Sequence, residues 1–245
     1  MSDLWVIRLG QVPYEAARDA QTRLAAARQS AEIPDLLLLL EHPPVYTRGR
    51  RTKEEELPMG EDWYRAQGIE VCDTDRGGAV TYHGPGQLVG YPIVSLKPYR
   101  DDVHAYVRGL EQVMIKSLGA FGIEAGLLDD STGVWVNGRK VGSIGVHVSR
   151  GVTTHGFAIN VNNDLQPFEW IVPCGIDDCR MTSVGRELGA AQDLARFSEV
   201  VTELFAEIYA RRPVPVSGDE LAARVAGIDV LRDATPAADP AAALP

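Results

Sequence analysis

Apolar residues recur along this chain at intervals that predict several helices. Over residues 103–121 they fall three and four positions apart, and Asp101 and Asp102 are suited to cap the start of the helix. The same spacing predicts a late helix over 197–208. An Ala- and Arg-rich stretch over 13–30 begins with a proline, a residue favoured in the first turn of a helix. We therefore expect at least three substantial helices.

Strands are expected between these helices. Apolar runs over 4–9, 33–40 and 153–161 have the length and composition of strands. Residues 134–136, followed by Asn137-Gly138, predict a hairpin with a type I′ turn, so that Lys140 lies early on the returning strand. Long helices beside antiparallel hairpins favour an α+β fold over a doubly wound parallel sheet.

The character of the chain changes near its C-terminal end. Residues 214–245 are rich in Ala, Pro and Asp, a composition that buries little apolar surface. We expect one folded domain over residues 1–213 and a partly disordered tail over 214–245, with a weak helical pattern near Leu221 and a loosely held or disordered part from about Asp233. No apolar run approaches the roughly 18 residues of a membrane span. The N-terminus also lacks the basic and apolar regions of an export signal, so we expect a cytoplasmic protein.

Charge and cysteine content exclude some functions. The 245 residues include 34 acidic and 24 basic side chains, and the net charge of -10 argues against a general nucleic-acid binder. The three cysteines, Cys72, Cys174 and Cys179, are too few for a disulfide framework, so free thiols are expected. Neither cysteines nor histidines show the spacing of paired metal ligands, and we expect no metal.

The segment over 76–93 places five glycines and a histidine among strand-forming residues. Glycines inside strands usually mark bulges or a close approach of backbone. The segment has no Gly-Lys-Ser/Thr ending and misses the dinucleotide pattern by one residue, which disfavours a nucleotide cradle. A glycine-bent sheet edge without a ligand explains the same composition.

Two residues stand out for their chemistry. Lys140 lies in an otherwise apolar strand. Burying its ammonium group unpaired would destabilise the fold by several kcal/mol, whereas a lysine that faces solvent there would indicate no function. Cys174 lies between Pro173 and Gly175, which suggests an exposed loop, although an isolated cysteine is more often an inert core residue. A neighbouring cationic lysine raises the thiolate fraction of a thiol whose ordinary pKa is about 8.5. A dyad of Cys174 with His83 or His155, as in a cysteine hydrolase, remains open.

Taken together and in order, these segments resemble the lipoyl(octanoyl) transferase family. The resemblance covers about residues 4–212, and the segments that carry it are 41–47, 76–87, 138–145, 154–160, 173–176 and 181–184. It implies the α+β fold of biotin and lipoate ligases, class II synthetase-like, with a mixed or antiparallel sheet packed against helices. It also implies an acyl-enzyme on Cys174, with Lys140 lowering the pKa of that thiol, and no cofactor. The substrate-binding residues that it implies are Arg76, Gly77, Gly78, Ala79, Val80, Thr81, Tyr82, His83, Ser143, Ile144, Gly145, Gly156, Phe157 and Ala158.

The activity implied is transfer of an octanoyl or lipoyl group from acyl carrier protein to a specific lysine, the first step of endogenous protein lipoylation. The acceptors implied are lipoyl domains of 2-oxoacid dehydrogenase E2 subunits and the glycine cleavage H protein, with no nucleic-acid or membrane partner. An ATP-dependent lipoate or biotin protein ligase, a cysteine-dependent thioesterase and a non-catalytic carrier-binding module are the alternatives.

Two details concern the substrates. Phe157 replaces the leucine of many family members, which is expected to narrow the acyl pocket. Acyl carrier proteins are acidic, so an acidic enzyme needs a local basic rim for docking. The side chains expected to form it are Arg48, Arg50, Arg51, Lys53, Arg76, Arg139 and Arg150.

Overall fold

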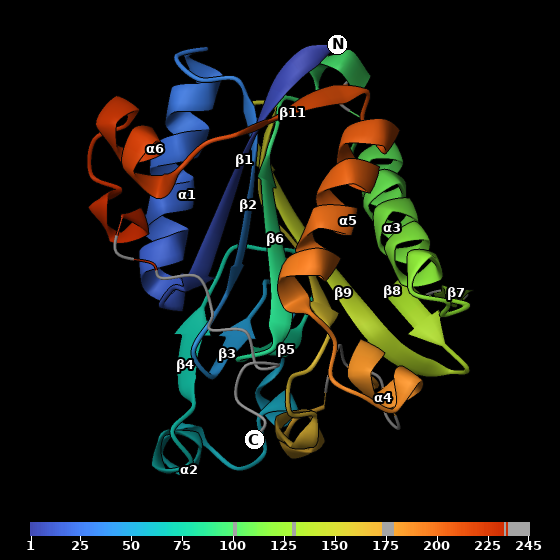
Figure 1. Ribbon diagram of the computed structural model, residues 1–245. Coiled ribbons are helices and arrows are strands. Elements are labelled where there is room, and N and C mark those ends of the chain that lie inside the picture. The colour runs from blue at the N-terminus through green and yellow to red at the C-terminus, as the bar shows by residue number, and fades with distance from the viewer. Residues whose placement is uncertain (100–101, 129–130, 173–178, 233, 235–245) are drawn as a thin grey trace, which may run out of the picture.

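The computed structural model describes residues 1–99, 102–128, 131–172, 179–232 and 234. These residues form an eight-stranded sheet in the order β11-β1-β2-β6-β10-β9-β8-β7, with helices on both faces (Figure 1). The strands are β1 (Ser2–Gln11), β2 (Asp35–Glu41), β6 (Gln87–Ile93), β7 (Gly126–Leu128), β8 (Ser131–Val136), β9 (Arg139–Ser149), β10 (Val152–Asn160) and β11 (Arg211–Pro215).

The large sheet is mixed, as the α+β prediction requires. β1 runs parallel to both β2 and β11, whereas the neighbours from β2 to β7 pair antiparallel. β2 is buried along its whole length because helices cover both of its faces, which explains its unbroken run of leucines. The expected hairpin joins β8 to β9, with positive φ angles at Asn137 (48°) and Gly138 (73°).

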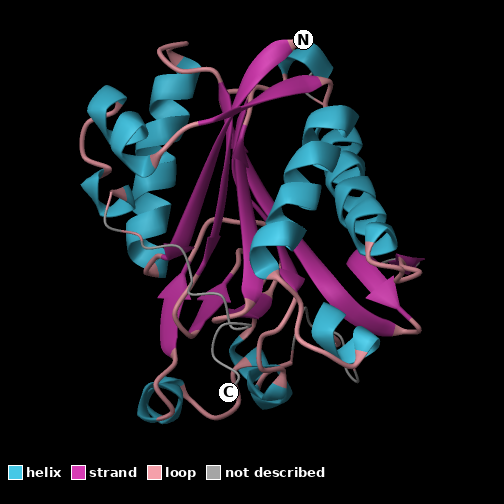
Figure 2. Ribbon diagram, viewed as in Figure 1, coloured by secondary structure: helices cyan, strands magenta, loops and turns pink. Residues whose placement is uncertain are grey.

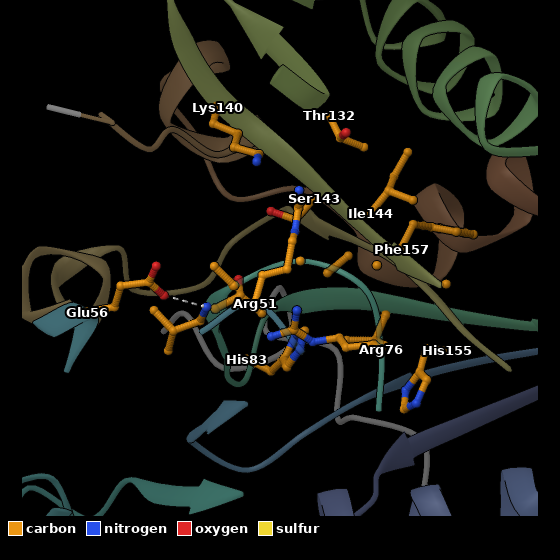
Figure 3. A pocket seen from close by; sticks show the side chains of 18 of the residues that line it. Arg51, Glu56, Arg76, His83, Thr132, Lys140, Ser143, Ile144, His155 and Phe157 are labelled. Carbon is orange, nitrogen blue, oxygen red and sulfur yellow. Dashed lines mark hydrogen bonds between the residues drawn. The ribbon is translucent and has the colours of Figure 1, made fainter. Parts of the chain in front are cut away.

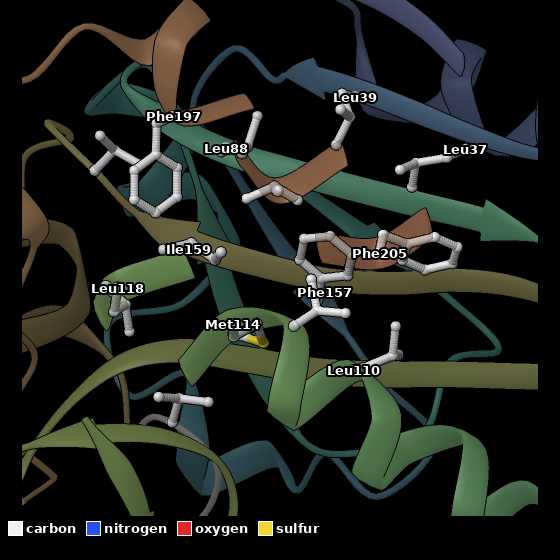
Figure 4. Packing of buried hydrophobic residues seen from close by; sticks show 14 of the residues in the cluster. Leu37, Leu39, Leu88, Leu110, Met114, Leu118, Phe157, Ile159, Phe197 and Phe205 are labelled. Carbon is white, nitrogen blue, oxygen red and sulfur yellow. The ribbon is translucent and has the colours of Figure 1, made fainter. Parts of the chain in front are cut away.

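Helices cover the two faces of this sheet (Figure 2). α3 (Val103–Ala120) and α5 (Leu194–Ile208) lie on one face, while α1 (Tyr14–Gln29) and α6 (Gly218–Arg224) lie on the other. Asp102 caps α3 by accepting a hydrogen bond from the Ala105 backbone N–H at 2.9 Å, as expected from the sequence. Figure 4 shows the α3–α5 side of the core, where Phe157 and Ile159 of β10 pack against Met114 and Phe205.

A second, smaller sheet extends from one end of the large one. It has the order β4-β3-β5, with β3 (Val45–Arg48) parallel to β4 (Glu70–Asp73) and antiparallel to β5 (Val80–His83). The short helix α2 (Glu61–Ala66) packs beside it. A further short helix, α4 (Val184–Leu188), comes after β10 in the chain and before α5. The glycine-rich residues 76–79 precede β5 and contact both sheets, because Arg76 donates to the Thr47 carbonyl of β3 and the Gly77 N–H donates to the Val146 carbonyl of β9.

The chain continues as folded structure beyond residue 213. The division expected at residue 213 falls inside β11, which pairs with β1. Beyond it, Leu221 and Ile228 are fully buried in the core cluster beneath α1. Residues 214–232 are therefore part of the folded layer, and residues 235–245 lie outside the described residues. Among the helices described, none combines the length and the apolar character that crossing a membrane requires.

Candidate functional site

A cavity of about 390 Å³ opens where the small sheet meets β9 and β10 (Figure 3). Most of the substrate-binding residues expected from the sequence line it: Arg76, Gly78, Ala79, Val80, Thr81, His83, Ser143, Ile144, Gly145, Gly156, Phe157 and Ala158. Lys140 lines the same cavity. Three separate sequence segments, 76–83, 140–145 and 156–158, are thus brought to one hollow.

Two of the expected residues lie elsewhere. The Tyr82 ring packs against the rings of Tyr46 and Phe168, at centroid distances of 5.6 and 5.4 Å, on the far side of the small sheet. Gly77 does not line the cavity but holds the glycine-rich loop to β9, because its backbone N–H donates to the Val146 carbonyl at 3.0 Å. Strand alternation explains Tyr82, since neighbouring residues of a strand face opposite sides.

The glycines of the cavity wall permit close approach of backbones. Gly145 and Gly156 face each other across β9 and β10. A Cβ atom on Gly145 would lie 2.8 Å from the Gly77 carbonyl oxygen, and one on Gly156 would overlap the carbonyl oxygen of Gly90. Any side chain at these positions would push the glycine-rich loop or β6 out of place.

Lys140 is buried in this wall, with 2% of its surface exposed. Its backbone N–H donates to the Arg180 carbonyl at 2.8 Å, and its Nζ lies 5.5 Å from the centroid of the Trp135 ring, within the range of a cation–π contact. A Cβ atom on Gly133 would lie 2.7 Å from Lys140 Cε, so the glycine leaves room for the lysine stem. The solvent-facing alternative is therefore wrong.

Cys174 lies outside the described residues, but the chain on either side of it is held at the cavity. The Val172 N–H donates to the Glu56 carbonyl at 3.0 Å, and Arg180 pairs with Lys140. Both Glu56 and Lys140 line the cavity. Val172 and Arg180, which precede and follow Cys174 in the chain, thus each form a backbone hydrogen bond with a residue of the cavity wall.

The other two cysteines differ from each other in burial. Cys72 is buried, and burial, together with the Glu15 carboxylate, raises the pKa of its thiol to about 12. This thiol stays protonated at neutral pH and is a poor nucleophile. Cys179 is half-buried, with its Sγ 4.0 Å from Met181 Sδ.

Arg76 fixes the glycine-rich loop to the small sheet. Its guanidinium donates to the Thr47 carbonyl at 2.6 Å, to the Thr47 hydroxyl at 2.7 Å and to the Gly77 carbonyl at 3.1 Å. The residue is 7% exposed and lines the cavity. Its guanidinium therefore places a buried cation in the wall of the cavity, between Lys140 and His155 (Figure 3).

The structure also reveals a cluster of buried rings that the sequence reasoning missed. The His42 ring joins the Val12 carbonyl through Nδ1 at 2.6 Å and the Tyr91 hydroxyl through Nε2 at 2.7 Å. The His83 ring lies 5.6 Å from it, and Tyr14 stacks on His83 with the ring planes 8° apart. The signal for His42 is its place directly after the fully buried strand β2.

Burial makes these imidazoles weak bases. It lowers the pKa of His42 to about 4 and that of His83 well below its usual value, the nearby His42 adding to the effect on His83. Burial lowers the pKa of His155 as well, with the Asp75 carboxylate opposing this shift. At neutral pH the cavity therefore has neutral rings at one end and a lysine at the other.

The side chains expected at a basic rim divide into two groups. Arg51 and Lys53 are exposed and line the cavity, with Arg50 exposed beside them. Glu54 and Glu55 are exposed next to them, so this basic rim is narrow. The remaining members are placed differently: Arg48 pairs with Glu61 and Asp73, Arg139 pairs with Glu187, Arg76 is buried, and Arg150 lines a second cavity.

Comparison with known proteins identifies relatives over most of the chain. A model of the lipoyl protein ligase A/B catalytic domain matches residues 13–206. The octanoyltransferase of Solibacter usitatus is 50% identical over 216 residues, which cover 88% of this chain and 96% of that protein. The octanoyltransferase of Rubrobacter xylanophilus is 49% identical over 201 residues, covering 81% and 90%.

Solved structures share the fold at much lower identity. A bi-partite lipoate protein ligase from Thermoplasma acidophilum superposes with a TM-score of 0.69 at 17% identity, covering 91% of each chain. The biotin protein ligase of Aquifex aeolicus gives a TM-score of 0.50 at 14% identity, covering 86% of this chain and 70% of that one. These likenesses confirm the expected ligase-like α+β fold.

Proposed function

This chain belongs to the lipoyl protein ligase A/B catalytic domain family and is an octanoyltransferase of protein lipoylation, and we propose that it carries the octanoyl group on Cys174, with Lys140 as the neighbouring cation. The observation that carries this proposal is the burial of Lys140 in the cavity wall, where 2% of its surface is exposed. Its backbone N–H also donates to the carbonyl of Arg180, six residues after Cys174. This burial places the Lys140 amine in the wall of the cavity, in cation–π contact with the Trp135 ring.

The proposed reaction has two steps. The Cys174 thiolate attacks the carbonyl carbon of the donor thioester, a new C–S bond forms, and the donor thiolate leaves and takes up a proton. The amine of the acceptor lysine then attacks the acyl-enzyme, the amide forms, and Cys174 is released as a thiol or thiolate. The first step exchanges one thioester for another and the second forms a more stable amide, so neither needs a nucleotide.

Covalent geometry supports the pairing of the two residues. Cys174 is two residues beyond Val172, so its Cα can lie at most about 7 Å from that of Val172. Val172 is held by Glu56 in the cavity wall. A cationic lysine at this cavity favours the thiolate of Cys174 and can receive the proton of the attacking amine once it is neutral.

The histidines of the cavity are poorer candidates than Lys140 for the group that activates Cys174. A Cys–His dyad needs an imidazole that accepts a proton near neutral pH. Burial lowers the pKa of both His83 and His155, so each ring is a weak base near neutral pH. A cysteine thioesterase built on these rings is therefore disfavoured.

The cavity suits a short acyl chain. Val80, Val89, Ile144, Phe157 and Ala158 contribute apolar groups to its lining. Each methylene that they bury adds about 0.8 kcal/mol, or about fourfold in affinity.

The proposed donor is octanoyl-acyl carrier protein, and the proposed acceptors are lipoyl domains of 2-oxoacid dehydrogenase E2 subunits and the glycine cleavage H protein. An acidic carrier would dock at the narrow basic rim of Arg50, Arg51 and Lys53, which are exposed at the cavity mouth. We assign no nucleic-acid or membrane partner, and we place the reaction in the cytoplasm.

Intact-mass analysis after mixing with octanoyl-acyl carrier protein tests the proposal. We expect one added octanoyl group that hydroxylamine removes, because a thioester is labile to it. Cys174→Ala should abolish the adduct, and the matched control Cys179→Ala should retain it. Full transfer activity in Cys174→Ala, or an unmodified mass under rapid quench at full activity, would remove the covalent step. Rapid release of free octanoate without an acceptor would instead indicate a thioesterase.

A further inference from the structure

One side chain is shared by two cavities. A second cavity, of about 250 Å³, lies between α1 and the β9–β10 hairpin, and we call it the outer cavity. Gln21, Ala26, Asp75 and Arg150 are among the residues that line it. His155 lines both the outer cavity and the acyl cavity described above, and it is 3% exposed.

The His155 ring is held firmly in this position. Its Nε2 lies 2.7 Å from Asp75 Oδ1, and its backbone N–H donates to Gln21 Oε1 at 2.7 Å. The Tyr91 ring stands at 85° to it, with the centroids 6.3 Å apart. The backbone of His155 has a φ of 56°, which few residues other than glycine adopt. Such strain persists only where the surroundings impose it.

The ring lies far from the proposed reacting end. Figure 3 draws Lys140 and His155 at opposite ends of the cavity, with Ser143 and Arg76 between them. An acyl chain that has its carbonyl carbon near Lys140 and runs along the cavity would bring its terminal methyl group towards His155. The ring Nδ1 is buried without a hydrogen-bond partner among the described residues.

We propose that the His155 ring is the wall that ends the acyl cavity and thereby limits the length of the chain that is transferred. This inference rests on the octanoyltransferase activity and is independent of which residue is the nucleophile. Removing the wall joins the acyl cavity to the outer cavity, which supplies the space that additional methylenes need.

A wall is required on energetic grounds. Each buried methylene gives about fourfold in affinity, so an open apolar cavity would bind a dodecanoyl chain roughly two hundredfold more tightly than an octanoyl chain. A preference for the shorter chain must therefore come from steric exclusion of the longer one and not from better contacts.

The decisive variant is His155→Gly, which suits the positive φ angle and removes the ring. Transfer to a lipoyl domain is measured with octanoyl, decanoyl and dodecanoyl donors on acyl carrier protein. We expect the ratio of kcat/KM for dodecanoyl to that for octanoyl to rise at least about tenfold, a small part of the affinity that four methylenes provide. Ala31→Gly is the matched control, because it relieves a positive φ (61°) at an exposed residue that lines neither cavity.

A second variant tests the path of the longer chain. Adding Ala26→Leu to His155→Gly narrows the outer cavity and should shift the preference back towards octanoyl, while Ala26→Leu alone should keep the wild-type ratio. If His155→Gly does not fold, His155→Asn replaces it, since asparagine tolerates this backbone region and is shorter.

An unchanged ratio in a folded His155 variant, or an equal loss for all three chains, would overturn the inference. Absence of octanoyl transfer by the wild-type protein would instead contradict the activity itself.

Discussion

Mild acid should destabilise this protein through His42, and replacing that residue should remove part of the effect. His42 has no exposed surface, and burial lowers the pKa of its imidazole from 6.5 to about 4. The unfolded chain takes up a proton near pH 6.5, whereas the folded protein takes it up only near pH 4. Between these values the unfolded state binds more protons, so the free energy of unfolding falls as the pH falls.

The magnitude follows from the size of this shift. One pKa unit corresponds to about 1.4 kcal/mol, and integration of the two titrations from pH 7 to pH 5 gives a loss of about 2 kcal/mol from His42 alone. His83, whose pKa is also lowered by burial, adds a loss in the same direction. A loss of this size is a large part of the stability of an ordinary domain.

Urea denaturation at pH 7 and pH 5 measures the effect. His42→Gln should be less stable than wild type at pH 7, because Gln replaces the imidazole that joins the Val12 carbonyl and the Tyr91 hydroxyl. Its further loss between pH 7 and pH 5 should be smaller than that of wild type by about 2 kcal/mol. His104→Gln, on the exposed face of α3, should show the full wild-type loss. Equal pH-dependent losses in His42→Gln and wild type would refute the reasoning.

Three further outcomes are expected. Lys140→Ala and Lys140→Arg should each lower the transfer rate at least about a hundredfold. Only the alanine variant should raise the pH at which iodoacetamide alkylates the proposed nucleophile, Cys174, because arginine keeps the positive charge. Near-normal turnover of Lys140→Ala would mean that Lys140 has only a structural role. Reversing Arg51 and Lys53 to Glu should raise the KM for an acyl carrier protein donor and weaken its dependence on salt, and a wild-type KM that ignores salt would contradict a docking role. Gly156→Ala should lower Tm by about 2–4 °C for each kcal/mol lost, because the new Cβ overlaps backbone of β6. Gly119→Ala, in open space on a helix, should raise it, and similar Tm values for the two would argue against crowding.

The elements that the sequence predicts well are those whose signals are local. The helix that Asp102 caps and the hairpin turn at Asn137 and Gly138 depend on residues a few positions apart. Residues 214–232 were expected in a tail because the chain beyond Pro213 is rich in Ala, Pro and Asp and its helical pattern near Leu221 is weak. They fold because Leu221 and Ile228 find apolar partners beneath α1, which no local pattern encodes.

The site divides in the same way. Motif segments and resemblance indicate Lys140 and the glycine-rich strands, and the structure brings these residues around one cavity. The ring cluster of Tyr14, His42 and Tyr91 is invisible in the sequence, because each ring comes from a different element and gains its meaning only from its neighbours. His155 lines two cavities at once, and the spacing of residues along the sequence predicts neither cavity.

The pairing of β1 with β11 has a consequence for synthesis on the ribosome. Asp3 and Arg212, which form an ion pair across these strands, are 209 residues apart, so β1 leaves the ribosome long before its outer neighbour exists. Until β11 arrives, one edge of β1 presents unpaired backbone groups to other nascent chains. The last strand to be synthesised therefore covers the edge of the first. A chain released before β11 is made would leave that edge of β1 exposed to pairing with other chains.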